Sequence, residues 1–225
     1  MYNVKYELPQ LNLYVAEKML TLKSYIENSI IPKYDNFDMA HRRSHAISVI
    51  ERSIKLAKML GADWQISYAA AAFHDLGLEE SRETHHLSSG RIIRKDRFLP
   101  LWFNAEQIET IAQAAEDHRA SSKNPPRSIY GKILAEADRD LTPEIVIKRC
   151  VLYEISHNAG LPMEEQMRNV VQHLQQKYGR HGYIKLYIPV SENEIHLKAI
   201  WKMLDSNEAA LTSVRKAFFA VRQQQ

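Results

Sequence analysis

Four residues of this chain are of the types that bind a divalent metal ion: His45, the adjacent pair His74 and Asp75, and Asp138. Two imidazoles and two carboxylates form a mixed nitrogen and oxygen donor set. Such a set suits Mn²⁺, Fe²⁺, Co²⁺ or Ni²⁺, and it also admits Mg²⁺ or Zn²⁺. Asp138 lies at the edge of an apolar stripe, where an isolated carboxylate would be costly to desolvate. A bound cation would remove that cost, so the pattern predicts a metal centre.

The His-Asp pair is expected at the end of a tightly packed helix. Residues 69–77 have the sequence AAAAFHDLG, and the four alanines favour a helix that its neighbours can approach closely. We expect Asp63 to cap the start of this helix and Gly77 to end it in the left-handed conformation. His45 lies on the preceding helix, 29 residues before His74. The antiparallel return of a helical hairpin can therefore bring His45 back to the pair.

The remaining sequence predicts an all-α protein. Glycine is scarce, at 7 of 225 residues, while hydrophobic residues make up 45% and charged residues 25% of the chain. Capping residues, prolines and apolar stripes at helical spacing delimit the helices. Tyr183–Ile188 is at most a short strand or an extended connector. The expected helices span residues 11–31, 36–60, 63–75, 85–97 and 104–118, then one ending near 138, one over 142–158, one ending near 177, and a long one from 191.

Charge and composition exclude several classes of partner. A formal net charge of +3 is too small to indicate nucleic-acid binding without a basic face. No apolar run approaches the ~18 residues of a membrane span, and the N-terminal residues lack the pattern of a signal peptide. The single Cys150 rules out an internal disulfide, which suits a reducing compartment. We therefore expect a soluble cytoplasmic protein with no nucleic-acid or membrane partner.

Three segments, taken together, resemble the HD-domain superfamily of metal-dependent phosphohydrolases. They are His45–Val49 (HAISV), Ala69–Gly77 (AAAAFHDLG) and Ala135–Asp140 (AEADRD). Their order and spacing match over residues 38–141. The resemblance implies an all-α bundle and hydrolysis of a phosphoester or phosphoanhydride, usually of a nucleotide. It also implies a metal site made by His45, His74, Asp75 and Asp138. We expect an HD-type helical domain over residues 1–178, and a small C-terminal extension packed on it over 179–225 that ends in the long helix.

Two further histidine positions resemble those of HD proteins that bind a second metal ion. His85, with His86 beside it, begins the helix after the His-Asp pair, and His118 ends the following helix. Each could bind a second ion or contact the substrate. Because the connector from Asp75 to His85 is short, we expect one ion rather than two. The arginine that often lies three residues after the first histidine is Ser48 here, and the Glu-Asp pair of guanosine-tetraphosphate hydrolases is absent, so their mechanism is not carried over unchanged.

The resemblance implies that a small phosphorylated substrate, expected to be a nucleotide, is hydrolysed with the help of the metal. Asp75 or Glu79 would accept the proton of the attacking water, and His118 or a nearby arginine would stabilise the developing charge. A basic loop beside His118 supplies candidate phosphate-binding residues, namely Arg119, Lys123 and Arg127. Two alternatives stay open: a binuclear di-iron oxygenase, and a non-catalytic module that binds a nucleotide or a protein. The sequence does not determine the oligomeric state.

Overall fold

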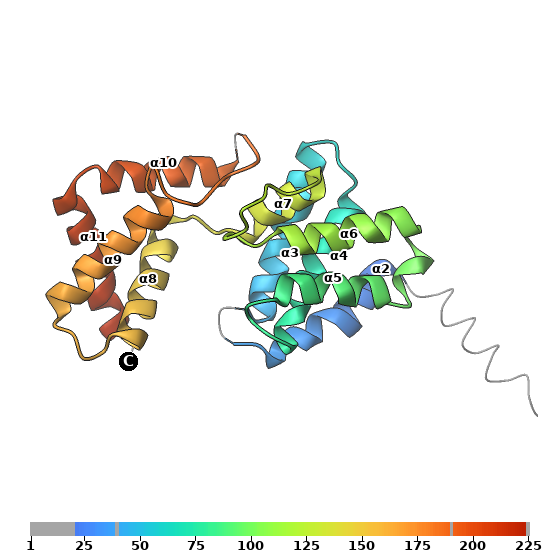
Figure 1. Cartoon of the computed structure of the whole chain (residues 1–225), viewed down its shortest axis with the longest axis horizontal. Coiled ribbons are helices and arrows are strands. Elements are labelled where there is room, and N and C mark those ends of the chain that lie inside the picture. Colours follow the sequence, from blue (N-terminus) through green and yellow to red (C-terminus); the bar gives the residue numbers. More distant parts are fainter. Residues whose placement is uncertain (1–20, 39–40, 190, 224–225) are drawn as a thin grey trace, which may run out of the picture. The chain divides into compact units, whose positions relative to one another are not determined.

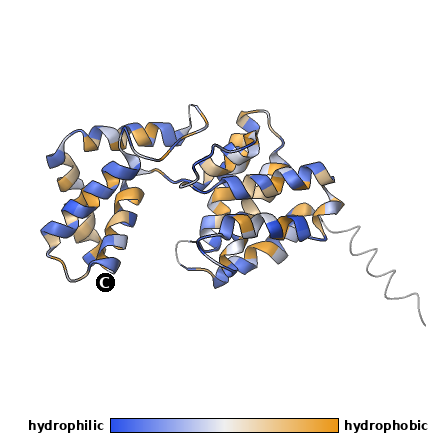
Figure 2. Ribbon diagram, viewed as in Figure 1, coloured by the Kyte–Doolittle hydropathy of each residue, from blue (hydrophilic) through white to orange (hydrophobic). Residues whose placement is uncertain are grey.

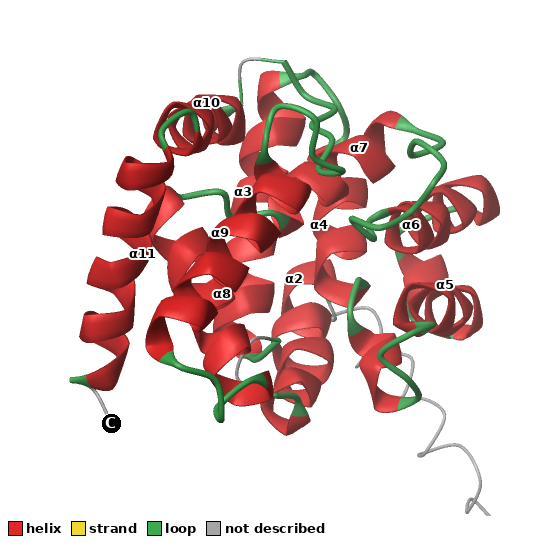
Figure 3. Ribbon diagram, turned by 60° about the vertical axis from the view of Figure 1, so that its left-hand side comes forward, coloured by secondary structure: helices red, strands yellow, loops and turns green. Residues whose placement is uncertain are grey.

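The computed structural model describes residues 21–38, 41–189 and 191–223 (Figure 1). These residues form helices joined by loops, and no strand occurs among them (Figure 3). The predicted all-α class is therefore confirmed, and residues 183–188 form an irregular connector. Residues 11–20 of the first expected helix lie outside the described part of the chain. None of the described helices is both long and apolar enough to cross a membrane.

The chain forms two compact units, which we name the first and the second unit. The first unit runs up to Asp117 and includes Arg127–Leu134, and the second unit comprises His118–Pro126 and the chain from Ala135 onward. The boundary therefore falls inside helix α7 (Ile129–Asp138). The expected domain boundary after residue 178 lies elsewhere in the chain than this boundary between compact units. The predicted division into an HD-type domain and a C-terminal extension stays a prediction.

Short helical turns open the first unit and longer α-helices complete it, whereas the second unit is built from long helices. The elements before α7 are α2 (Leu22–Tyr25), the π-helix η1 (Ile26–Ile30), the 3₁₀ helix η2 (Ile31–Asn36), α3 (Arg43–Met59), α4 (Trp64–Phe73), the 3₁₀ helix η3 (Leu76–Glu79), α5 (His85–Lys95), the 3₁₀ helix η4 (Leu99–Leu101) and α6 (Ala105–Asp117). The elements after α7 are α8 (Pro143–His157), α9 (Met163–Tyr178), α10 (Glu192–Leu204) and α11 (Asn207–Arg222).

Helix α4 is the buried centre of the first unit. It packs against α3 and α6, and every residue from Ile66 to Phe73 is buried. The alanines at 69–72 have no exposed surface, so neighbouring helices approach this backbone closely. Asp63 caps the helix as predicted, because its carboxylate accepts a hydrogen bond from the amide of Gln65 at 2.8 Å. The His-Asp pair directly follows this closely packed helix.

Gly77 does not end helix α4 in the left-handed conformation, so that expectation is wrong. Positive φ is found at Gly61, at 66°, and Gly77 lies within η3. Gly77 is needed for close approach instead. A Cβ at this position would lie 2.1 Å from the carbonyl oxygen of His85 and 2.7 Å from the amide nitrogen of Ser89. The glycine thus lets the start of α5 pack directly against the turn that carries the His-Asp pair.

Helices α8–α11 of the second unit share one hydrophobic core. Hydrophobic and hydrophilic residues alternate along their ribbons (Figure 2), and α11 packs against both α8 and α9. Val151, Leu174 and Phe218 are fully buried in this core. The long helix expected from residue 191 is interrupted after α10, because the Ser206 side chain accepts a hydrogen bond from the amide of Ala209 and caps a new helix, α11.

Candidate metal centre

The Asp75 carboxylate lies among three histidine side chains. Nε2 of His74 is 3.1 Å from Oδ2 of Asp75, and Nε2 of His45 is 3.7 Å from the same oxygen. The other oxygen, Oδ1, is 3.4 Å from Nε2 of His85. His74 and Asp75 are almost fully buried, while His45 and His85 are partly exposed. The predicted return of α3 toward the end of α4 is therefore present, and α5 adds a third imidazole.

Hydrogen bonds to the main chain orient two of these imidazoles. Nδ1 of His74 lies 2.7 Å from the carbonyl oxygen of Ala71. Nδ1 of His85 lies 2.8 Å from the carbonyl oxygen of Arg82. Because a carbonyl oxygen only accepts, each Nδ1 carries a proton, and in the neutral ring Nε2 is then the nitrogen with the lone pair. Metal-binding histidines are commonly held in this way, with one nitrogen donating to a carbonyl and the other free to ligate.

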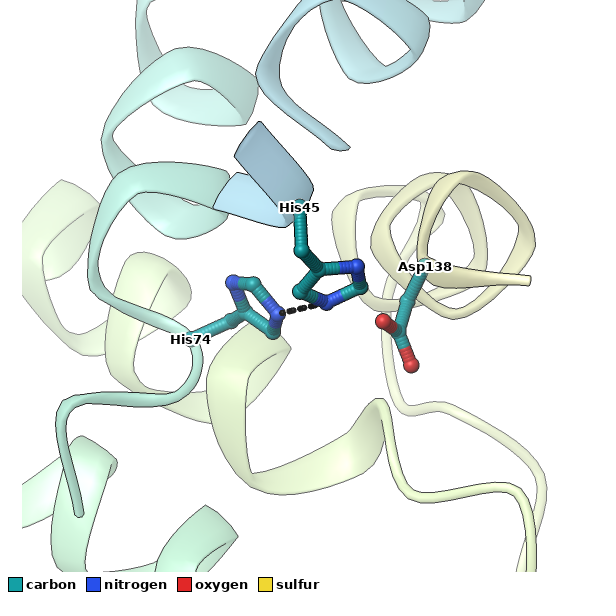
Figure 4. Close-up of side chains that lie close together, drawn as sticks. All are labelled: His45, His74 and Asp138. Atoms are coloured by element: carbon teal, nitrogen blue, oxygen red, sulfur yellow. Dashed lines mark hydrogen bonds between the residues drawn. The ribbon is translucent and has the colours of Figure 1, made fainter. Parts of the chain in front are cut away.

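The centre brings potential ligand atoms close together. Nε2 of His74 is 3.3 Å from Nε2 of His45 (Figure 4) and 3.1 Å from the Asp75 carboxylate. A buried cluster of this kind is costly unless a cation lies among its members. The donor set therefore fits a divalent metal ion.

Two groups of three side chains have the spacing of metal ligands. Within each group, one potential ligand atom from every residue lies within 4.8 Å of the others. Figure 4 shows one of these groups, that of His45, His74 and Asp138. The groups are His45, His74 and Asp138, and Asp75, His85 and His118. All the predicted metal-binding residues except His86 thus fall into one of the two groups, and their role as ligands is a prediction that these positions favour.

Buried polar contacts hold the backbone around the His-Asp pair. The hydroxyl of Tyr34 donates to the carbonyl oxygen of Ala72 at 2.9 Å and accepts from the amide of Asp75 at 3.3 Å. The hydroxyl of Ser89 accepts from the amide of Gly77 at 2.9 Å. Tyr34 is fully buried. Sequence reasoning did not single it out, because its two partners lie 38 and 41 residues away and no motif marks it.

Several predicted residues belong to neither group of ligand atoms. Glu79 is exposed at the end of η3. His86 is half-buried, and its ring centroid lies 5.6 Å from that of His85. In the basic loop, Arg119 is half-buried and Lys123 is exposed. Their predicted roles as proton acceptor, ligand and phosphate-binding residues therefore stay predictions.

Arg127 is engaged by two carboxylates of helix α6. Its Nε lies 3.0 Å from an oxygen of Asp117, and its Nη2 lies 2.6 Å from an oxygen of Glu116. The amide of Arg127 also donates to Asp117 at 2.7 Å. The hydrogen bond that Arg127 donates to the Asp117 carboxylate is the main cause of the raised pKa of Arg127. The predicted contact of Arg127 with a substrate phosphate would have to replace these ion pairs.

The sequence profile of the HD domain family matches residues 42–142, the region that contains both groups of ligand atoms. Over these residues the chain is similar to the HD domain. The predicted resemblance is therefore confirmed. The chain is also similar to a crystal structure, that of a predicted HD superfamily hydrolase from an uncultured Thermotogales bacterium. The two share 25% sequence identity with a TM-score of 0.50, and the match covers 73% of this chain and 95% of the other. No curated protein matches the chain.

Proposed function

We propose that this protein is a metal-dependent hydrolase of the HD superfamily that cleaves a phosphoester or phosphoanhydride of a small molecule, with nucleotides as the first candidates. The HD domain and the similarity to a predicted HD superfamily hydrolase support the hydrolase class. The observation that carries the proposal is the arrangement of Asp75, which presents one carboxylate oxygen to His45 and His74 and the other to His85. A cytoplasmic location and the absence of nucleic-acid and membrane partners are parts of the same proposal.

We assign metal binding and proton transfer to separate sets of residues, which share only Asp75. His45, His74 and Asp138, with Oδ2 of Asp75, would hold a divalent ion of the Mn, Fe, Co or Ni type, or Mg or Zn. Such an ion supplies Lewis acidity that acidifies a water molecule and polarises a phosphoryl oxygen. Asp75 or the exposed Glu79 would accept the proton of the attacking water.

His118 and the basic loop that follows it would act on the substrate. His118 is buried, so a charge that develops near it is poorly screened by water, and a hydrogen bond from the imidazole stabilises that charge strongly. Arg119 and Lys123 would contact the substrate phosphate, and Arg127 would join them only by exchanging Glu116 and Asp117 for the substrate.

The number of ions separates this proposal from its binuclear alternative. The expectation of one ion stays a prediction. The group of Asp75, His85 and His118 favours a second ion, because Oδ1 of Asp75 lies 3.4 Å from Nε2 of His85, whereas Oδ2 makes the contacts with His45 and His74. Two ions would suit a binuclear hydrolase, and two irons would suit a di-iron oxygenase.

A substrate panel tests the reaction class. Metal-free protein is incubated with nucleoside mono-, di- and triphosphates and with dinucleoside polyphosphates, in the presence of Mn²⁺, Co²⁺ or Ni²⁺. We expect release of phosphate or nucleotide by the wild type and none by His74→Ala. Tight nucleotide binding without turnover would instead establish the non-catalytic module, and oxygen consumption by an iron-loaded protein would establish the oxygenase.

Metal stoichiometry decides the number of ions. Elemental analysis of wild type, His85→Ala and His118→Ala would give near one ion in all three if the centre is mononuclear. A fall from two ions to one in both variants would establish the binuclear form. His86→Ala serves as a matched control, because His86 neighbours His85 but belongs to neither group of ligand atoms.

A further inference from the structure

The C-terminal end of helix α7, which carries Asp138, is capped by a side chain from helix α10. The last carbonyl groups of a helix have no partner within the helix. The amide of Asn193 donates to the carbonyl oxygens of Glu136 and Arg139, both at 2.9 Å. Its side-chain oxygen accepts from the amide of Leu141 at 3.2 Å. One buried asparagine therefore fixes the main chain on both sides of Asp138.

The carboxylate of Glu136 is a second attachment of the same helix end. Glu136 is 1% exposed, and a buried carboxylate needs hydrogen-bond donors. The hydroxyl of Ser191 donates to Oε1 at 2.6 Å, and the amide of Tyr187 donates to Oε2 at 3.3 Å. Ser191 is also the residue that caps the start of α10. The start of α10 and the end of α7 are thus joined through a single serine.

Arg139 provides a third attachment. It is 7% exposed, and its Nη1 donates to the carbonyl oxygen of Lys185 at 2.6 Å. The guanidinium lies 5.6 Å from the ring centroid of Tyr187, within the range of a cation–π contact. Glu136 and Arg139, which flank Asp138, are therefore held by four residues that, like Asp138 itself, lie in the second unit, namely Lys185, Tyr187, Ser191 and Asn193.

We propose that Asn193 and Ser191 are positioning residues for Asp138 and thereby set the affinity of the metal centre. The proposal rests on the proposed metal centre. A ligand must be held within a few tenths of an ångström, so the groups that orient ligands have large effects on affinity, about 10–100-fold when removed. A helix end without its cap frays, and fraying at α7 displaces Asp138 while leaving His45 and His74 in place.

Metal titration tests the proposal without any substrate. Metal-free protein is titrated with Co²⁺, and its thermal midpoint is measured with and without the ion. We expect Asn193→Ala to raise the dissociation constant for Co²⁺ about 10–100-fold and to shrink the rise in Tm that Co²⁺ produces. Ser191→Ala should have a smaller effect of the same kind, and Ser191→Thr, which keeps the hydroxyl, should restore affinity.

Asn169→Ala is the matched control. Asn169 also lies in the second unit and also donates to a buried carboxylate, that of Glu154, at 2.8 Å. It should lower the midpoint of the metal-free protein while leaving the Co²⁺ dissociation constant unchanged. If the role of Asn193 were merely structural, Asn193→Ala would likewise lower the midpoint of the metal-free protein and leave the Co²⁺ dissociation constant unchanged.

Three outcomes would overturn the proposal. The first is wild-type Co²⁺ affinity in Asn193→Ala while Asp138→Ala has lost it. The second is equal loss in Asn169→Ala, which would trace the effect to general destabilisation. The third is wild-type affinity in Asp138→Ala itself, which removes the ligand and with it the proposed metal centre. If Asn193→Ala does not fold, the comparison of Ser191→Ala with Ser191→Thr decides the question by the same readouts.

Discussion

The two helix ends that carry the acidic candidate ligands are supported in different ways. Asp75 directly follows the buried alanine stretch of α4, and its backbone is held by Tyr34 and by the close approach of α5 at Gly77. The end of α7, with Asp138, is held by Asn193 and by other groups of the second unit that lie about fifty residues further along the chain.

The difference indicates which part of the centre is fixed and which can be adjusted. Packing of α4 with its neighbours and the position of Asp75 depend on the same buried contacts, so changes there should affect stability and metal binding together. Asn193 is attached to the main chain on both sides of Asp138, so changes to it should affect metal affinity more than the stability of the first unit.

Removal of the central carboxylate should have the largest effect. Asp75→Ala deletes both oxygens that face the three histidines. We expect metal affinity to fall by more than the ~10–100-fold that loss of an orienting group causes, and hydrolysis to be lost with it. Metal titration, with circular dichroism to confirm folding, checks the result. Wild-type affinity in a folded Asp75→Ala protein would contradict the geometry on which the centre is built.

Crowding the turn after α4 should be the next largest effect. In Gly77→Ala the new Cβ would lie 2.1 Å from the carbonyl oxygen of His85, so the backbone must move. We expect a loss of about 3 kcal/mol in the free energy of unfolding, the upper end of the usual range for overpacking, together with weaker metal binding. Gly160→Ala is the control, because nothing lies within 4 Å of its Cβ position. Equal urea midpoints for the two variants would refute the close-approach explanation.

Loss of the Tyr34 hydroxyl should have a smaller effect. Tyr34→Phe leaves the buried amide of Asp75 and the carbonyl of Ala72 without this partner, which should cost about 1–2 kcal/mol in the free energy of unfolding. Tyr130→Phe is matched to it, because the Tyr130 hydroxyl accepts a hydrogen bond from the amide of Asp63 at an exposed site. Urea unfolding should therefore separate the two variants, and equal losses would argue against a special role for Tyr34.

An ion pair between α5 and α6 should give the smallest effect. The hydrogen bond from Arg94 lowers the pKa of Glu109 to about 2. Because the folded-state pKa lies below the usual 4.5, the stabilisation is complete above that value and is lost as the pH falls toward 2. The pair is largely exposed, so we expect at most about 1 kcal/mol. Wild type should therefore lose slightly more stability between pH 4.5 and 2.5 than Glu109→Gln, and Glu106→Gln should behave like wild type.

Local features of the sequence predicted much of the fold and part of the site. Asp63 caps α4 as expected, and Asn104 and Gln107 form a reciprocal capping pair at the start of α6, with both hydrogen bonds at 2.9 Å. These contacts join residues within three positions of each other, where side-chain type and spacing determine the partner. The approach of His45 to His74 was predictable for a related reason, because two consecutive helices joined by a short turn have few possible packing arrangements.

Contacts between distant residues were not predictable. Nothing in the sequence near Tyr34 or Asn193 indicates which main-chain groups they bind, because those groups are brought to them only by the tertiary fold. The role of Gly77 was misassigned for the same reason, since its steric constraint comes from α5 and not from its own backbone conformation. The interruption after α10 depends on Ser206, a weak local signal within an otherwise continuous helical pattern.

The central claim is that the ends of α4 and α7 supply ligands to one metal centre. Elemental analysis of wild type, His74→Ala, Asp138→Ala and His157→Ala, purified in parallel, tests it most directly. His157 is the control, since it lies on α8 stacked against Tyr153 and belongs to neither group of ligand atoms. We predict a bound divalent transition metal in wild type and His157→Ala, and its loss from both His74→Ala and Asp138→Ala. Equal metal content in all four proteins would contradict the claim.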